Sequence, residues 1–289
     1  MPRTFILTLS CPQRPGIVHA VTAFLFGHGC DIVEHQQFDD PIRGALFLRT
    51  EFLRTEVVAS GDVEAAQLSS AFKVEVADEF EMDFNLSDDS PQRVLVMVSK
   101  MGHCLNDLIF RWRAGSLNAD LVAVVSNHED LRPMAEAGGL PFIHVPVTPE
   151  SKPQAEQRLL ELVDEYRADV VVLARYMQVL SDSLCLKLLG RAINIHHSFL
   201  PGFKGAKPYH QAYDRGVKLV GATAHYVTGD LDEGPIIEQD IARISHADGA
   251  EDLVAIGRDT ESRVLARAVK NHLERRVLLC GNRTVVFSK

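Results

Sequence analysis

Two polar residues at the end of an apolar run, Asn194 and His196, are the first candidates for chemistry in this chain. The run at residues 192–195 is typical of a buried strand. Because residues two apart on a strand project from the same face, both side chains should face one site. An amide can donate a hydrogen bond to a developing oxyanion, and an imidazole can move a proton near neutral pH. The pair therefore predicts acyl chemistry at the carboxyl end of this strand, where open α/β sheets bind ligands.

A second block supplies an aspartate that could complete the site. The two blocks read Asn-Ile-His-His-Ser-Phe-Leu-Pro from residue 194 and His-Tyr-Val-Thr-Gly-Asp-Leu-Asp-Glu-Gly-Pro-Ile-Ile from residue 225. Together they resemble the signature of the folate-dependent formyltransferase family, and the resemblance covers residues 93–289. It implies that Asn194, His196 and Asp232 are the catalytic residues.

The segment at residues 173–180, Leu-Ala-Arg-Tyr-Met-Gln-Val-Leu, follows the fourth predicted strand. In the family this segment lines the pterin pocket, and a flat apolar ring needs such a slot with a few fixed polar contacts. A plain lead-in to the next helix is the alternative interpretation. The resemblance implies substrate binding by Arg175, Met177, Gln178, Val179, Leu180, Phe203, Thr228, Gly229 and Asp230.

The loop at residues 99–107, Ser-Lys-Met-Gly-His-Cys-Leu-Asn-Asp, distinguishes branches of this family. Members that formylate a ribonucleotide carry a glycine-rich loop here, whose amides hold the substrate phosphate at a helix N-terminus. This loop keeps one glycine and adds Met101, so it resembles members in which water replaces the amine acceptor. Hydrolysis of 10-formyltetrahydrofolate to formate and tetrahydrofolate is implied, which would supply purine synthesis and balance the one-carbon pool. Formyl transfer to an amine such as glycinamide ribonucleotide is the alternative.

Other histidines give weaker signals. His197 should point to the opposite face of the strand from His196, which indicates a structural role. His103, His210 and His225 are candidates for the pocket rim, and Lys100 could contact a phosphate. A zinc site built from His196, His210, His225 and Asp232 is the competing chemistry, but the spacing matches no compact ligand motif. We therefore expect neither a metal nor a cofactor, with folate as substrate only.

Alternating apolar and amphipathic stretches predict a doubly wound, mostly parallel sheet in the C-terminal part. The predicted strands are residues 94–98, 121–125, 142–145, 170–173 and 192–195, and the helices between them are residues 105–113, 131–137, 152–166 and 181–189. Late strands at 219–227 and 236–244, a helix at 250–273 and a hairpin at 277–279 and 284–287 follow.

The N-terminal part predicts a ferredoxin-like βαββαβ domain. The predicted strands are residues 4–9, 31–38, 45–52 and 73–79, and the helices are residues 17–25 and 63–72. Arg-Pro-Gly-Ile-Val at residues 14–18 resembles the opening of an ACT domain, a module that often binds amino acids between paired copies. An amino-acid effector and a homo-oligomer, dimer or tetramer, are implied, and assembly of subunits alone is the alternative. We predict domains at 1–84 and 93–289, joined by a polar linker at 85–92.

Net charge, cysteine spacing and the length of apolar runs limit these interpretations. A formal charge of -9 over 289 residues argues against a nucleic-acid partner. The five cysteines lack paired spacing, which indicates a reducing cytoplasm rather than a disulfide framework. Since no window approaches 18 uninterrupted apolar residues, we expect no membrane span.

Overall fold

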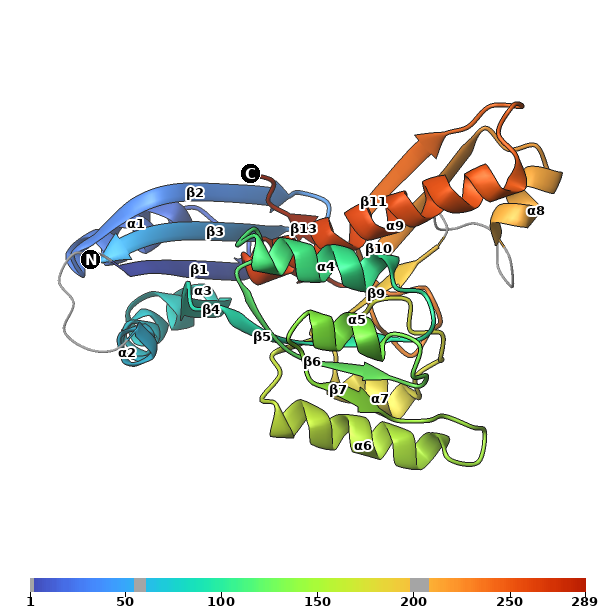
Figure 1. The fold of residues 1–289 in the computed structure, drawn as a ribbon. Helices are drawn as coiled ribbons and strands as arrows, with labels where there is room; N and C mark the ends of the chain where they lie inside the picture. Colours follow the sequence, from blue (N-terminus) through green and yellow to red (C-terminus); the bar gives the residue numbers. More distant parts are fainter. Residues whose placement is uncertain (1–2, 55–60, 198–207) are drawn as a thin grey trace. The chain divides into compact units, whose positions relative to one another are not determined.

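The computed structural model describes residues 3–54, 61–197 and 208–289 (Figure 1). Contacts divide the chain into two compact units. The first comprises Met1–Ser90, Glu274–Cys280 and Val285–Lys289, and the second comprises Pro91–Leu273 and Gly281–Thr284.

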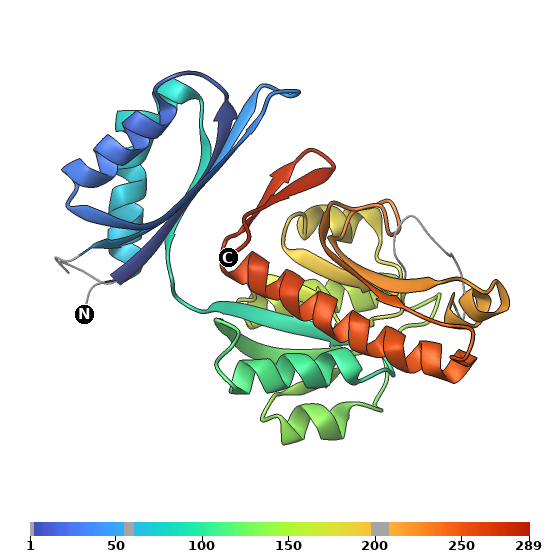
Figure 2. The same cartoon turned by 90° about the horizontal axis from the view of Figure 1, so that it is seen from above.

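The first unit is a four-stranded antiparallel sheet in the order β2-β3-β1-β4. Its N-terminal elements are β1 (Arg3–Pro12), α1 (Ile17–Gly27), β2 (Cys30–Asp40), β3 (Ala45–Arg54), α2 (Gly61–Phe72), the π-helix η1 (Lys73–Ala77), α3 (Asp78–Phe80) and β4 (Asp83–Asp88). Figure 2 shows α1 and α2 on the same face of the sheet. Alternate residues of β1, including Phe5, Leu7 and Leu9, are buried in this core. The predicted ferredoxin-like βαββαβ order is confirmed.

The predicted strand at residues 73–79 is wrong. Residues Lys73–Ala77 form the π-helix and Asp78–Phe80 continue it as α3. Val74 and Val76 are two apart, as on one face of a strand, but Val74 is 75% exposed, whereas Val76, Ala77 and Phe80 are buried at helical spacing. The closing strand is β4 instead.

The predicted linker at 85–92 is shorter in the structure, because residues 85–88 lie in β4 and β5 begins at Gln92. β4 is an edge strand of the four-stranded sheet, and of its six residues Leu86 alone is buried, which explains its polar composition.

The predicted extent of the second domain to residue 289 also differs from the structure. The terminal elements are β12 (Val277–Cys280) and β13 (Arg283–Val286), and most of this segment belongs to the first unit. Phe47, Cys280 and Phe287 share a small apolar core. Arg276, 1% exposed, lies 2.9 Å from the Glu34 carboxylate. The segment therefore packs on the N-terminal sheet through both apolar and ionic contacts.

The second unit is built on a seven-stranded sheet in the order β11-β10-β9-β8-β5-β6-β7. Its strands are β5 (Gln92–Val98), β6 (Ala119–Ser126), β7 (Phe142–His144), β8 (Val170–Leu173), β9 (Ala192–His196), β10 (Leu219–Tyr226) and β11 (Ile236–Arg243). The first five run parallel, and β10 and β11 are antiparallel to their neighbours. The predicted doubly wound, mostly parallel sheet is confirmed.

Helices cover both faces of this sheet (Figure 1). They are α4 (His103–Arg113), α5 (Arg132–Ala137), α6 (Lys152–Glu165), α7 (Asp182–Lys187), α8 (Pro208–Asp214) and α9 (Ala250–Leu273). Side chains of α6 and α7, such as Leu159 and Leu184, share one apolar core with Leu95 and Met97 of β5. The short helix α8 was not predicted. None of the helices in the described ranges is long and apolar enough to cross a membrane.

Candidate active site

Strand β9 carries Asn194 and His196 to one cavity of about 480 Å³. β9 lies between β8, to which it is parallel, and β10, to which it is antiparallel. His196 is the last residue of β9 and is 8% exposed. Both side chains line the cavity, as the two-residue spacing predicted. The sheet therefore places an amide and an imidazole side by side at the carboxyl end of β9.

The turn between β10 and β11 brings Asp232 to the same cavity. Asp232 has a left-handed backbone, φ 58°, which is uncommon for a residue with a side chain and clusters at functional sites. At Gly234 the chain passes so close to β10 that a Cβ atom would lie 1.8 Å from the Tyr226 carbonyl oxygen. This tight return holds Asp232 Oδ2 at 3.1 Å from His196 Nδ1.

The Asp232 carboxylate is held in its charged form. Burial alone would raise its pKa, but the hydrogen bond from His196 lowers the pKa well below the usual range. His196 Nδ1 donates to this carboxylate, so the hydrogen of the neutral ring lies on Nδ1 and Nε2 is left as an acceptor. His196 Nε2 is buried and has no hydrogen-bond partner among the described residues. It is therefore the ring nitrogen that has no partner in the described part of the chain and could exchange a proton with a reacting molecule.

His225, expected only as a rim residue, lies at the centre of the site and is 2% exposed. Its Nδ1 is 2.9 Å from the Tyr226 carbonyl oxygen, which can only accept, so Nδ1 carries the hydrogen. Its Nε2 lies 3.3 Å from Asn194 Nδ2 and 3.6 Å from Asp232 Oδ1. His225 thus accepts one amide hydrogen of Asn194 and leaves the other for the cavity.

The predicted substrate-binding residues gather around the same cavity. It is lined by Arg175, Met177, Gln178, Val179, Leu180, Thr228, Gly229 and Asp230. Phe203 lies outside the described residues. Met177 and Val179 are more than half exposed, which gives the cavity an apolar mouth. Ser99 Oγ accepts a hydrogen bond of 3.0 Å from the Met177 backbone and so fixes this segment to the end of β5.

His197 departs from the expectation of a residue on the far side of the strand. β9 ends at His196, so the strand alternation no longer applies, and the two imidazoles stack with centroids 4.7 Å apart. His197 lines the cavity and its Nδ1 lies 2.8 Å from Arg175 Nη1. Burial lowers the pKa of His197 to about 4, helped by the nearby charges of Arg175 and His196. The ring is therefore neutral at physiological pH.

This depressed pKa predicts how stability depends on pH. The unfolded chain binds a proton at His197 near the ordinary value of 6.5, whereas the folded chain does so only near 4. The free energy of unfolding should therefore decline as pH falls from about 6.5 to 4, by no more than about 3 kcal/mol from this group. In the variant His197→Phe, urea unfolding at several pH values should show a shallower decline in this window. An identical slope in both proteins would contradict the assignment.

The structure does not bring together the four residues of the alternative zinc site. His196 and His225 both contact Asp232, but His210, on α8, is not among the residues that line the cavity. Lys100 and His103 do not line it either.

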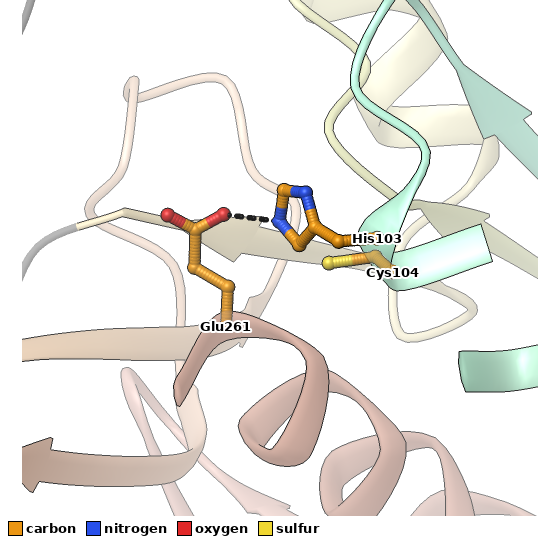
Figure 3. Close-up of side chains that lie close together, drawn as sticks. All are labelled: His103, Cys104 and Glu261. Carbon is orange, nitrogen blue, oxygen red and sulfur yellow. Dashed lines mark hydrogen bonds and ion pairs between the residues drawn. The ribbon is translucent and has the colours of Figure 1, made fainter. Parts of the chain in front are cut away.

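One other group of the described residues has metal-ligand chemistry, namely His103, Cys104 and Glu261 (Figure 3). His103 Nε2 lies 2.8 Å from Glu261 Oε2, and Tyr209 donates to Oε1 at 2.6 Å. The Arg175 guanidinium is 3.3 Å from Oε2. Burial raises the pKa of the Cys104 thiol, which disfavours a thiolate ligand. Because both carboxylate oxygens already have partners and a cation lies beside them, the group fits an ion-pair anchor better than a metal site.

Comparisons with known proteins agree with this geometry. The sequence model described as "Formyl transferase" matches residues 92–269. A formyltetrahydrofolate deformylase from Corynebacterium sp. (strain P-1) is 54% identical over 98% of this chain and 97% of that protein. One from Bacillus subtilis (strain 168) is 50% identical over 98% and 93%.

Solved structures show the same similarity to formyltetrahydrofolate deformylases. The crystal structure of a formyltetrahydrofolate deformylase from Burkholderia mallei has a TM-score of 0.93 and 51% identity, and covers 99% of this chain and 100% of that one. A glycinamide ribonucleotide transformylase from Symbiobacterium toebii has a TM-score of 0.64 and 29% identity, and covers 69% of this chain and 95% of that one. The likeness to the deformylase structure thus includes the first unit.

Proposed function

This chain belongs to the formyl transferase family, and we propose from this premise that it is a formyltetrahydrofolate deformylase, which hydrolyses 10-formyltetrahydrofolate to formate and tetrahydrofolate. The observation that carries the proposal is the convergence of Asn194, His196 and Asp232 on one cavity. Relatives that carry the deformylase name match nearly the full chain, including the first unit. Assay of the purified chain for formate and tetrahydrofolate tests the activity directly.

On the basis of this geometry we propose a step in the hydrolysis for each residue. The free amide hydrogen of Asn194 donates to the formyl oxygen as that oxygen gains negative charge. His196 Nε2 accepts a proton from the water that adds to the formyl carbon, and Asp232 stabilises the imidazolium that results. His196 then returns the proton to the folate nitrogen as the carbon–nitrogen bond breaks. Asp232 also orients the water, because it is an ionised acceptor in the same cavity.

The cavity mouth suits the folate ring. Met177, Val179 and Leu231 are exposed apolar side chains in a cavity lining that combines further apolar residues with a smaller number of polar ones. An apolar slot with a few fixed polar groups is what a flat heterocycle requires. We assign the ring to the segment from Arg175 to Leu180 and the polar contacts to Thr228, Gly229 and Asp230.

The surroundings of α4 favour water over a ribonucleotide amine as the acceptor. The Glu261 carboxylate lies beside the first residues of α4, His103 and Cys104, where an N-terminus would otherwise attract an anion. Gly102 is packed against Met134, so that a Cβ atom there would meet Met134 Cε at 2.9 Å. A substrate phosphate at this place would meet a buried carboxylate rather than an open cradle.

We predict that formate appears at the same rate with and without glycinamide ribonucleotide. Without an anchored phosphate, the amine loses the positioning that can be worth roughly 7–11 kcal/mol in well-oriented reactions. Chromatography of the products should show no formylated ribonucleotide. If stoichiometric formylated product appears and formate is suppressed, the chain is a transferase.

The proposed activity has wider consequences. Formate release would supply purine synthesis and balance the one-carbon pool. The five cysteines are all free thiols, which fits the reducing cytoplasm that the sequence predicts.

The antiparallel βαββαβ unit supports an ACT-like module, for which we propose an amino-acid effector and a homo-oligomer, dimer or tetramer. Light scattering and thermal shift with a panel of amino acids test these two proposals.

A further inference from the structure

A buried ion pair next to His197 includes none of the three predicted catalytic residues. It joins Glu261, 1% exposed, to Arg175, with Oε2 and Nε 3.3 Å apart. His103 and Tyr209 hold the same carboxylate from α4 and α8. Although burial alone would raise the pKa of Glu261, its partners His103 and Arg175 lower the pKa below the ordinary value. Glu261 is therefore a fixed negative charge.

Backbone features hold this pair in place. On α9, Gly257 lies one turn before Glu261, and a Cβ atom at Gly257 would lie 2.1 Å from Tyr209 Cζ. The missing side chain lets the Tyr209 ring lie against α9 and reach Glu261. Arg175 has φ 65°, a left-handed conformation that non-glycine residues seldom adopt. Such strain persists only where surrounding contacts determine the conformation, and it clusters at functional sites.

The ion pair fixes the tautomer of His197. Arg175 Nη1 lies 2.8 Å from His197 Nδ1, and a guanidinium can only donate hydrogen bonds. His197 Nδ1 must therefore accept, so the hydrogen of the neutral ring lies on Nε2. His197 Nε2 is buried and has no partner among the described residues. A buried donor without a partner costs roughly 1–3 kcal/mol, so it calls for an explanation.

The cavity provides that explanation. His197 lines it together with Asn194 and His196. Asn194 donates one amide hydrogen to His225 and keeps only one for the formyl oxygen. Preorganised donors that meet developing negative charge are a large source of catalysis. We propose, on the basis of the hydrolytic function above, that His197 Nε2–H is a second donor to the oxygen atoms that react in the cavity, and that Arg175 and Glu261 are positioning residues that fix this donor.

The charged groups around His197 make this arrangement sensitive to pH. Arg175 faces it from the end of β8, His196 from β9, Asp232 from the turn before β11 and Glu261 from α9. Replacement of Arg175 by methionine removes a cation and leaves the Glu261 charge uncompensated, and both changes raise the pKa of His197. The acid limb of the kcat profile should therefore move to higher pH in Arg175→Met.

The tautomer can be tested without an activity assay. In protein with ¹⁵N-labelled histidine, the ring signals of His197 are those that disappear in His197→Phe. At pH 7 these signals should show Nδ1 as unprotonated and Nε2 as protonated. In Arg175→Met the same signals should move towards the average of both tautomers and the charged form. A His197 ring with its hydrogen on Nδ1 in the unmodified protein overturns the proposal.

Three variants at one position test the donor. His197→Phe keeps a ring against His196 but has no donor, and kcat should fall by about 10–10²-fold, less than for a single oxyanion donor because Asn194 remains. His197→Gln places an amide hydrogen near the position of Nε2 and should be about tenfold more active than His197→Phe. His197→Asn reaches only the position of Nδ1 and should resemble His197→Phe. KM for the folate should change little throughout.

The outcomes separate this inference from the proposed function. Equal kcat for His197→Phe and the unmodified protein overturns the donor role, as does His197→Gln no more active than His197→Phe. If the unmodified protein releases no formate, the deformylase proposal fails, and the nitrogen spectra still decide whether Arg175 fixes the tautomer. Circular dichroism and thermal melts identify any variant that has lost its fold. If His197→Phe does not fold, the kcat values of His197→Gln and His197→Asn still test the donor.

Discussion

The variant Asp232→Asn should fold and lose about 10²–10⁴-fold in kcat/KM, the range for a removed acid–base group. In the unmodified protein His196 Nδ1 lies 3.1 Å from Asp232 Oδ2. The amide oxygen of the variant can still accept this hydrogen bond, so the ring should keep its position. The amide carries no charge, however, and cannot stabilise the imidazolium that forms when His196 takes a proton. Formate release by the purified variant measures the loss.

A matched control is available in the same unit. Asp240 is also a paired aspartate, 2.9 Å from Arg263 Nε, but it is not among the residues lining the cavity. Asp240→Asn removes two partly exposed ion pairs, with Arg263 and Arg267, each worth about 0.2–1 kcal/mol of stability, and should leave hydrolysis unchanged. Near-normal hydrolysis by Asp232→Asn would remove Asp232 from the mechanism.

The residues that could be predicted are those whose placement depends on local geometry. The two-residue period of a strand is enough to place Asn194 and His196 on one face, and the apolar run before them identifies β9. The sequence pattern also predicted the sheet architecture, because the strands of a parallel sheet are buried on both faces and form continuous apolar runs. Asp232 required the second block of the family pattern, since nothing local relates it to β9.

The contacts that sequence reasoning missed join distant parts of the chain. Arg175 and His197 are 22 residues apart, and His103 and Glu261 are 158 residues apart. Glu261 lies in a long amphipathic helix where a charged residue normally indicates a solvent-facing position. The one signal that could have pointed to it is Gly257, one turn earlier, because a glycine inside a helix is unfavourable and often marks a close contact.

The division between the units at Ser90 and Pro91 lies within the predicted linker, but the length of the linker and the place of the C-terminal segment were wrong for a related reason. Polar composition at residues 85–88 suggested a linker, although an edge strand such as β4 tolerates the same composition. Arg276 pairs with Glu34 across 242 positions, and no local pattern predicts that a charged C-terminal segment belongs to the N-terminal sheet.

The second large effect is expected from Asn194→Asp, a change that preserves size and shape. The carboxylate has no hydrogen to donate to the formyl oxygen and places negative charge where negative charge must develop. Loss of a single oxyanion donor costs about 10²–10³ in kcat, with KM for the folate little changed because the ring-binding segment is untouched. Asn106→Asp, at an exposed position on α4, is the matched control.

The pH dependence of the residual activity distinguishes this cause from misfolding. In the unmodified protein the Asn194 amide donates to His225 Nε2, which also lies 3.6 Å from Asp232 Oδ1. A new carboxylate at position 194 would compete with Asp232 for this ring, and two like charges around one imidazole favour protonation of one carboxyl group. A protonated carboxyl group is again a donor. The residual kcat of Asn194→Asp should therefore rise as pH falls towards about 4, the ordinary carboxyl pKa, while that of Asp232→Asn should not. Parallel pH profiles for the two variants would show that Asn194 acts through structure rather than through its amide hydrogen.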